Sequence, residues 1–177
     1  MKIEVVSKEN YSKSQNEGLD QLHAAVYPPE VIASLPGKRY SWASPQLSIF
    51  LWDQDELVTR VGLLIREIYH DGIAKSVGGI GGVMTHPARQ GLGFASRAMR
   101  EASKYFNDEL HVSFALLFCR PHLIDFYQRL LWKPFKGTVY VEQPNGKIEF
   151  SVNGAMVLDV KEQAPLVGEL DLNGLPW

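Results

Sequence analysis

A glycine-rich segment at residues 77–100 constrains the fold of this chain more than any other stretch. It begins as the apolar run VGGIGGVMT, turns at His86 and Pro87, and passes through QGLG into a stretch with helical spacing that continues to about Phe106. The apolar positions expected on the buried side of that helix are Ala95, Ala98, Met99, Ala102, Tyr105 and Phe106. The segment therefore predicts a strand that leads through a glycine turn into an amphipathic helix.

The turn before this helix has the features of an anion site. The first amides of a helix lack partners within the helix and lie at the positive end of its dipole. Gly91 and Gly93 carry no Cβ, so a ligand can approach the main chain closely. These features predict a site for a pyrophosphate. A glycine-containing turn that binds nothing is the alternative.

Two other families that bind phosphates at such turns fit less well. A P-loop ends in Gly-Lys followed by Ser or Thr, and that sequence is absent. A dinucleotide-binding fold places an acidic residue at the end of the next apolar strand, whereas that strand here runs into Phe118, Cys119 and Arg120.

The segment resembles the acetyl-CoA signature of the GCN5-related N-acetyltransferase (GNAT) superfamily, which is Gln or Arg, two residues, Gly, one residue, then Gly or Ala. Gln90, Gly93 and Ala95 occupy these places. The resemblance implies that acetyl-CoA is the co-substrate, with its pantetheine arm paired to the preceding strand. The residues implied to bind it are Val83, Met84, Thr85, Gln90, Gly91, Leu92, Gly93, Phe94, Ala95 and Ser96.

Composition limits the class of protein. A chain of 177 residues, 45% of them hydrophobic, is expected to form one domain over residues 1–177. A net charge of −2 argues against non-specific binding of nucleic acid. The single Cys119 excludes an internal disulfide, and neither a signal peptide nor a membrane-spanning segment is recognisable, so we expect a cytoplasmic protein. No pair of His or Cys has metal-ligand spacing, so no metal is expected.

The rest of the chain supplies the remaining elements. Strands are expected at residues 2–6, 47–52, 57–69, 73–85 and 111–119, and helices at residues 10–26, 29–35 and 121–131. A hairpin of residues 139–141 with residues 148–160 follows, interrupted near Asn153 and Gly154, and residues 163–177 are expected to wrap the surface. This β-α-α-β-β-β-α-β-α-β-β order matches the GNAT fold, an α/β (α+β) architecture with a mixed, mostly antiparallel, twisted sheet between helices.

Tyr127 lies in a second stretch that resembles the superfamily. The pattern there is a helical Tyr, four residues and an aromatic, which Tyr127 and Trp132 satisfy; Leu131 stands where a Gly usually precedes the aromatic. The resemblance implies that Tyr127 is the general acid that protonates the departing thiolate of CoA, a proton transfer that a phenol can perform. A tyrosine that only packs in the core is the alternative.

The base that would deprotonate the amine is not evident. Family members often carry a Glu on the glycine-rich strand, where this chain has Gly81 and Gly82. His23, His86 and His122 are candidates that could act through a water. Cys119 is not expected to act as a nucleophile, because direct attack of the amine leaves it no role and a buried thiol is inert.

The second half of the chain is similar to aminoglycoside 2'-N-acetyltransferases, which also end in a tryptophan after a short acidic tail. The resemblance implies an aminoglycoside-type amine as substrate, with the Trp177 indole as a wall and, if the native chain ends there, its carboxylate as an anchor. Because Gly81 and Leu175 stand where relatives carry acids, a less cationic drug such as kasugamycin fits better. The implied substrate-binding residues are Trp177, Gly81, Gly82, Phe118, Glu30, Trp42, Glu149 and Asp171.

Two alternatives stay open at the level of function. The chain could transfer a longer acyl group or act on another small amine, such as a polyamine or a peptide. It could also be a CoA-binding module without catalytic activity. Members of the superfamily are often homodimers, and no segment of this sequence indicates one specifically.

Overall fold

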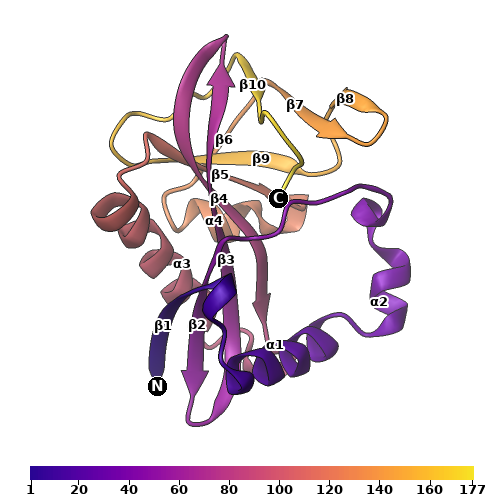
Figure 1. Cartoon of the computed structure of the whole chain (residues 1–177), viewed down its shortest axis with the longest axis vertical. Helices are drawn as coiled ribbons and strands as arrows, with labels where there is room; N and C mark the ends of the chain where they lie inside the picture. The colour runs from indigo at the N-terminus through magenta and orange to yellow at the C-terminus, as the bar shows by residue number, and fades with distance from the viewer.

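The computed structural model describes residues 1–177 and consists of one twisted, ten-stranded sheet with helices on both faces (Figure 1). The strands are β1 (Lys2–Ser7), β2 (Leu47–Asp53), β3 (Glu56–His70), β4 (Ile73–Thr85), β5 (Phe114–Cys119), β6 (Lys133–Pro134), β7 (Thr138–Gln143), β8 (Gly146–Glu149), β9 (Gly154–Asp159) and β10 (Glu169–Asp171). The helices are α1 (Lys13–Val26), α2 (Pro29–Ser34), α3 (Phe94–Tyr105) and α4 (Ile124–Gln128). The predicted fold class is confirmed, and no helix is both long and apolar enough to cross a membrane.

The 15-residue strand β3 organises the sheet. One edge pairs along its length with β4, while the other edge pairs first with β2 and then, at its far end, with β10. The strand order is therefore β6-β9-β5-β4-β3-β10-β7-β8, with β2 and β1 beside the first half of β3. Among these pairs, only β4 with β5 and β10 with β7 are parallel.

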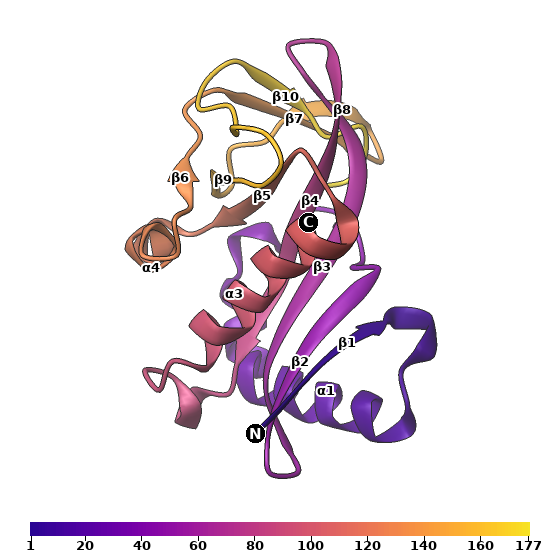
Figure 2. The ribbon, with the colours of Figure 1, turned by 90° about the vertical axis from the view of Figure 1, so that its left-hand side faces the viewer.

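Alternating apolar residues of β2 cover the two faces of the sheet. Ile49 and Leu51 pack into the large cluster that contains Met99 of α3, whereas Phe50 packs with Leu22 of α1. Because successive side chains of a strand point to opposite faces, α3 and α1 lie on opposite sides of the sheet. Figure 2 shows α3 in front of the strands, with α1 lying across their lower part.

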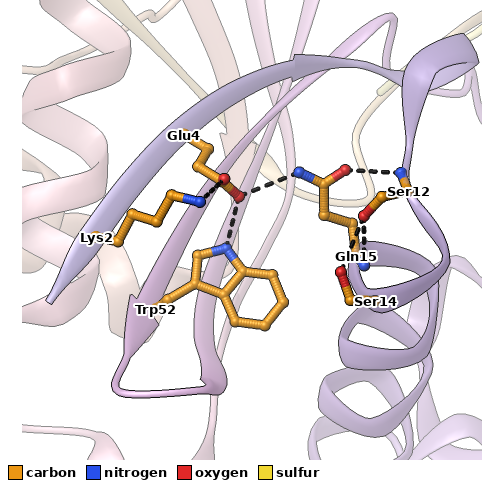
Figure 3. Close-up of polar contacts among 6 residues, drawn as sticks. All are labelled: Lys2, Glu4, Ser12, Ser14, Gln15 and Trp52. Atoms are coloured by element: carbon orange, nitrogen blue, oxygen red, sulfur yellow. Dashed lines mark hydrogen bonds and ion pairs between the residues drawn. The ribbon is translucent and has the colours of Figure 1, made fainter.

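A polar network fixes the start of α1 to the first two strands (Figure 3). The Glu4 carboxylate accepts hydrogen bonds from Trp52 Nε1 at 2.9 Å and from Gln15 Nε2 at 3.1 Å, and it forms an ion pair with Lys2. Gln15 also forms a capping box with Ser12. The Lys2 hydrogen bond is the largest influence that lowers the pKa of Glu4. The network sets the direction in which α1 leaves the sheet.

Strands β4 and β5 part after four residue pairs, which end at Ile80 and Leu117. A β-bulge follows directly in β4, where Gly82 and Val83 together face the single residue Val61 of β3. Gly82 has a φ of 57°, and the buried Arg60 guanidinium donates a hydrogen bond to its carbonyl oxygen at 3.0 Å. The bulge bends β4 away from β5 and opens the sheet.

The glycines of β4 make room for aromatic rings of the protein itself. A Cβ at Gly78 would lie 2.5 Å from the Phe106 ring, and a Cβ at Gly79 would lie 2.5 Å from the Trp177 indole. A Cβ at Gly81 would lie 3.1 Å from the main-chain carbonyl carbon of Trp177. Gly78 and Gly79 therefore accommodate side chains of the protein rather than a ligand.

The prediction that residues 163–177 wrap the surface is wrong. Within them, β10 lies between β3 and β7 and is the only link between the β7–β8 hairpin and the rest of the sheet. The side chains of Leu170, Leu172 and Trp177 are buried. A three-residue strand is too short to show period-two alternation, so its pairing is decided by partners distant in sequence.

The predicted hairpin of residues 139–141 with residues 148–160 is partly wrong. Residues 146–149 pair with β7 as β8, but residues 154–159 form β9, which pairs with β5 and β6. The chain leaves β7 at the buried Phe150 and passes through Asn153, near the predicted interruption. The predicted arm of thirteen residues is longer than the six residues of β7 with which it was expected to pair. Its second half therefore pairs with other strands.

The predicted helix at 121–131 is shorter than expected, because α4 ends at Gln128 in a Schellman motif. Trp132 N donates to the Tyr127 carbonyl at 3.2 Å, and Leu131 N donates to the Gln128 carbonyl at 3.0 Å. Leu131 has a φ of 70° at the position that favours Gly. The motif places the buried Trp132 ring 6.4 Å from the Tyr127 ring. The helix 10–26 and the strand 111–119 likewise begin three residues later than predicted, at Lys13 and Phe114.

We predict that Gly82→Ala destabilises the protein by about 2–4 kcal/mol, since it combines an unfavourable φ with overpacking against Arg60. A Cβ at Gly82 would lie 2.2 Å from Arg60 Nη1. Gly91→Ala is the matched control, because Gly91 has a φ of 77° and nothing lies within 4 Å of its Cβ position. Urea unfolding without ligand should give the control a loss of about 1–2 kcal/mol. Equal losses would show that Arg60 does not hold the bulge.

We predict that Leu131→Gly stabilises the protein by about 0.5–1 kcal/mol, or roughly 1–4 °C in Tm. The substitution removes the strain of a positive φ from a side chain that is 76% exposed and so sacrifices little packing. Leu166→Gly is the control, because Leu166 is also exposed but its φ is not positive. Calorimetric melting should show a lower Tm for Leu166→Gly, and a lower Tm for both variants would contradict the prediction.

Candidate functional site

Two cavities meet where β4 and β5 part. The first, which we call the α3 cavity, lies at the start of α3 and has a volume of about 720 Å³. The second, the Trp177 cavity, lies on the other side of the opening, has a volume of about 500 Å³ and is lined by Trp177, Trp42, Phe118 and the bulge of β4. The residues that line both are Tyr27, Val83, Arg120, Leu123 and Tyr127.

The α3 cavity gathers the residues expected at an acetyl-CoA site. Nine of the ten line it, and the exception is Leu92, whose side chain is 65% exposed. The nine residues come from two segments, Val83 to Thr85 on β4 and Gln90 to Ser96 at the turn. The structure therefore brings together the strand and the turn that the sequence pattern had linked.

The turn into α3 presents free main-chain donors. Gly93 is the N-cap residue with a φ of 83°, and no side chain caps the helix. None of the amides from Gly91 to Ser96 donates a hydrogen bond within the protein, while the Arg97 amide already donates to the Gly93 carbonyl at 3.0 Å. With the positive end of the helix dipole behind them, these amides form a site for an anion.

Three arginines beside these amides were not among the predicted site residues. Arg89 is paired with Glu56 at 3.0 Å and with Asp53 at 3.7 Å, whereas Arg120 and Arg129 form no ion pair. Arg120 and Arg129 follow β5, and because β5 runs parallel to β4, the carboxyl ends of both strands face the same opening. That parallel pairing is the signal by which the segment after Cys119 could have been assigned to the site.

Tyr127 lies on the wall that the two cavities share. Its side chain is 5% exposed, and its hydroxyl makes no hydrogen bond within the protein. Burial is the main cause that raises the pKa of Tyr127 above its ordinary value, and the neighbouring Cys119 and Tyr27 add to it. The hydroxyl is therefore a protonated donor without a partner of its own.

Cys119 lines the Trp177 cavity, but its thiol is unreactive. Burial raises the pKa of Cys119 to about 11, and its sulfur lies 3.5 Å from the Met156 sulfur. Because the thiolate is the nucleophilic form, a thiol with this pKa holds its proton at neutral pH.

The Trp177 cavity contains five of the eight residues expected to bind substrate, namely Trp177, Gly81, Gly82, Phe118 and Trp42. The Trp177 indole Nε1 donates to the Leu116 carbonyl at 3.1 Å. The Arg66 guanidinium carbon lies 5.1 Å from the centre of the same indole, and Arg66 Nη1 donates to the Leu175 carbonyl at 2.7 Å. The indole is thus fixed from both ends as a wall of the cavity.

The three acidic residues expected to bind substrate do not line either cavity. Glu30 lies on α2 and Glu149 on β8, both with exposed side chains. Asp171 lies on β10, where its carboxylate accepts hydrogen bonds from Lys147 Nζ and from the Asn173 amide. The charged side chains that do line the Trp177 cavity, Lys38 and Arg120, are cations that the sequence pattern did not indicate.

The three histidines considered as bases lie apart from one another. His122 lines the α3 cavity. His23 lies on α1, and its ring is 5.1 Å from the ring of Tyr27, the residue that follows this helix. His86 Nδ1 accepts a hydrogen bond from the Ala88 amide at 3.2 Å, and its Nε2 faces Glu56 at 3.9 Å. None of them lines the Trp177 cavity.

Solved structures share this architecture at low sequence identity. Escherichia coli ElaA is 18% identical, with a TM-score of 0.63 over 90% of this chain and 100% of that one. A GNAT family acetyltransferase from Brucella melitensis in complex with acetyl-CoA is 15% identical, with a TM-score of 0.58 over 96% and 94% of the two chains. An aminoglycoside 6'-N-acetyltransferase complexed with coenzyme A is 13% identical, with a TM-score of 0.58 over 91% and 99%. These likenesses concern the fold.

A search of curated proteins found no match to this sequence. Residues 10–135 match the family described as the acetyltransferase (GNAT) domain, a span that includes β4, the turn into α3, and Tyr127. The chain therefore belongs to the GNAT family of N-acetyltransferases, whose acyl donor is acetyl-CoA.

Proposed function

We propose that this protein acetylates an amino group of a small molecule by direct transfer from acetyl-CoA, with Tyr127 as the general acid. The observation that carries the proposal is the position of Tyr127, whose hydroxyl has no hydrogen-bond partner in the protein, on the wall that the two cavities share. The α3 cavity would hold the donor and the Trp177 cavity the amine. The two reactants would then meet at the opening between β4 and β5, where positioning lowers the barrier.

The residues of the α3 cavity fit the donor. The free amides from Gly91 to Ser96 suit a diphosphate, and the unpaired Arg129 adds positive charge beside them. Residues 83–85 of β4 extend beyond the last pair with β5, so this part of the strand has an open edge toward the cavity. An open strand edge can pair with an amide-containing chain such as a pantetheine arm.

Tyr127 would supply one proton. When acetyl-CoA is bound it provides a thioester carbonyl that an amine can attack directly. The bond from the amine nitrogen to the acyl carbon forms, the carbon–sulfur bond breaks, and the departing sulfur takes the proton of the Tyr127 hydroxyl. The new amide nitrogen releases one proton, which returns through water to the Tyr127 oxygen. Because the pKa of Tyr127 lies above that of a free tyrosine, the hydroxyl holds this proton at every pH at which amines react.

The Trp177 cavity has no side chain suited to remove the proton from the amine. No Asp, Glu or His side chain lines it, and the Cys119 thiol has a pKa of about 11. The amine is therefore expected to enter in its neutral form or to lose its proton to water.

The Trp177 cavity bears on the predicted aminoglycoside substrate in two ways. The indoles of Trp42 and Trp177 offer flat faces on which a sugar ring can pack. Its charged lining residues, Lys38 and Arg120, repel a drug that carries many ammonium groups. Among aminoglycosides, this lining therefore favours one with few positive charges, such as kasugamycin.

The direct test is the release of free thiol from acetyl-CoA with a panel of amines. The panel should contain kasugamycin, the more cationic kanamycin, a polyamine, a short peptide and simple aromatic amines. We expect turnover with at least one amine, and faster turnover of kasugamycin than of kanamycin. Tight binding of CoA by calorimetry without turnover of any amine would instead indicate a binding module.

We predict that Tyr127→Phe lowers kcat by about 100-fold or more, as loss of a general acid does, while the affinity for CoA stays the same. For the unchanged protein, kcat/KM should rise with pH as the amine loses its proton. It should not fall again before about pH 10, because the raised pKa keeps Tyr127 protonated beyond the ordinary tyrosine value. Stopped assays from pH 6 to pH 10 measure the kcat of both proteins and the pH profile of the unchanged one. Equal kcat values for Tyr127→Phe and the unchanged protein would refute the role of Tyr127.

We predict that Gly93→Asp weakens CoA binding at least about 10-fold, because it places a carboxylate where the diphosphate is expected. Gly72→Asp is the matched control: Gly72 has a φ of 79° against 83° for Gly93, and neither has an atom within 4 Å of its Cβ position. Titration calorimetry should show normal CoA affinity for Gly72→Asp. A similar loss in both variants would mean that the α3 turn does not bind the diphosphate.

A further inference from the structure

The charged side chains that line the Trp177 cavity are both cations. Its 19 lining residues include Lys38 and Arg120 and no Asp or Glu. Lys38 Nζ donates to the Ala33 carbonyl at 2.7 Å and so is occupied within its own loop. Arg120 forms no ion pair and no side-chain hydrogen bond, and its side chain is exposed to the solvent of the cavities. An unpaired guanidinium in a substrate cavity is suited to bind a carboxylate with two parallel hydrogen bonds.

Arg120 lies close to the site of the reaction. It follows Cys119, the last residue of β5, and lines both cavities together with Val83 and Tyr127. An anion bound by Arg120 would therefore lie next to the amine that meets the donor beside Tyr127. The anion and the reacting amino group must then be close together in the same molecule.

The remainder of the cavity is apolar and aromatic. The Phe118 ring lies 6.1 Å from the Trp177 ring and 5.0 Å from Phe150, which in turn lies 5.7 Å from Trp42. These rings form a surface on which an apolar or aromatic group can pack edge to face or offset. Most of the lining residues are hydrophobic, so the acceptor needs an apolar body to fill the space.

We infer that the acceptor is a zwitterion, an amine with a carboxylate next to the reacting amino group and an apolar or aromatic body, as in an apolar α-amino acid. Arg120 binds the carboxylate, and the ring cluster of Trp42, Phe118 and Trp177 binds the body. This inference rests on the proposed transferase function and specifies its substrate. In the transfer the amine loses one proton, the new nitrogen–carbon bond replaces the carbon–sulfur bond, and the carboxylate takes no part.

The experiment compares phenylalanine with 2-phenylethylamine, which differ only in the carboxylate. The measured quantity is the ratio of their kcat/KM values, followed by thiol release and by mass spectrometry of the N-acetyl product. Arg120→Gln should lower this ratio about 10- to 100-fold relative to the unchanged protein, the loss expected for one charge-assisted pair. The two amines differ in pKa, but this difference affects the ratio equally in the variant and in the unchanged protein, so it does not affect the comparison. An effect of Arg120→Gln on acetyl-CoA binding changes the turnover of both amines equally and so cancels in the ratio.

Arg129→Gln is the matched control, because Arg129 is an unpaired arginine that lines only the α3 cavity. It should raise the KM for acetyl-CoA and leave the ratio unchanged. If Arg120→Gln instead raises the KM for acetyl-CoA with the ratio unchanged, Arg120 belongs to the donor and the inference is wrong. The inference is also wrong if only amines without a carboxylate are acetylated, and that result would leave the transferase function standing. No thiol release with any amine would overturn both.

Discussion

The separation of β4 from β5 is the constraint on which the site depends. The two strands pair for four residues, and the bulge at Gly82 and Val83 then turns β4 aside. Arg60 holds the bulge by its hydrogen bond to the Gly82 carbonyl, and Arg60 Nε donates to Ser48 at 2.9 Å. A buried cation without a carboxylate partner is costly, so its role is best understood as fixing a main chain that would otherwise straighten. Both cavities exist because this opening is kept.

The side chains at the opening are held by packing rather than by hydrogen bonds to one another. Tyr127 is positioned by the end of α4, where the Schellman motif at Leu131 places Trp132 against it. Trp177 is positioned by Leu116 on one side and Arg66 on the other. The proposed general acid, Tyr127, and the cavity wall, Trp177, therefore come from two segments that are far apart in the sequence. Each segment has been fixed in place by contacts outside the reaction centre.

Local patterns in the sequence were sufficient for the donor side of the site. The strand, the glycine turn and the first residues of α3 are consecutive, and their apolar spacing and glycines act over a few residues. The acceptor side is assembled from distant segments, so no local spacing in the sequence identifies Lys38, Arg120 and Asn153 as site residues. The acidic charge of Asp171 suggested a substrate-binding role, but its partner Lys147 lies on β8, one strand beyond β7, and is brought near it by the pairing of β10 with β7. A three-residue strand is below the length at which alternation can be read.

The placement of β10 has a consequence for how the protein is made. Its partners β3 and β7 both precede it in the chain, and the β7–β8 hairpin has no other connection to the sheet. Until residues 169–171 leave the ribosome, the nascent chain exposes two strand edges that cannot yet find their common neighbour. Docking of β10 between them therefore completes the sheet last and covers the edges at which two nascent chains could pair.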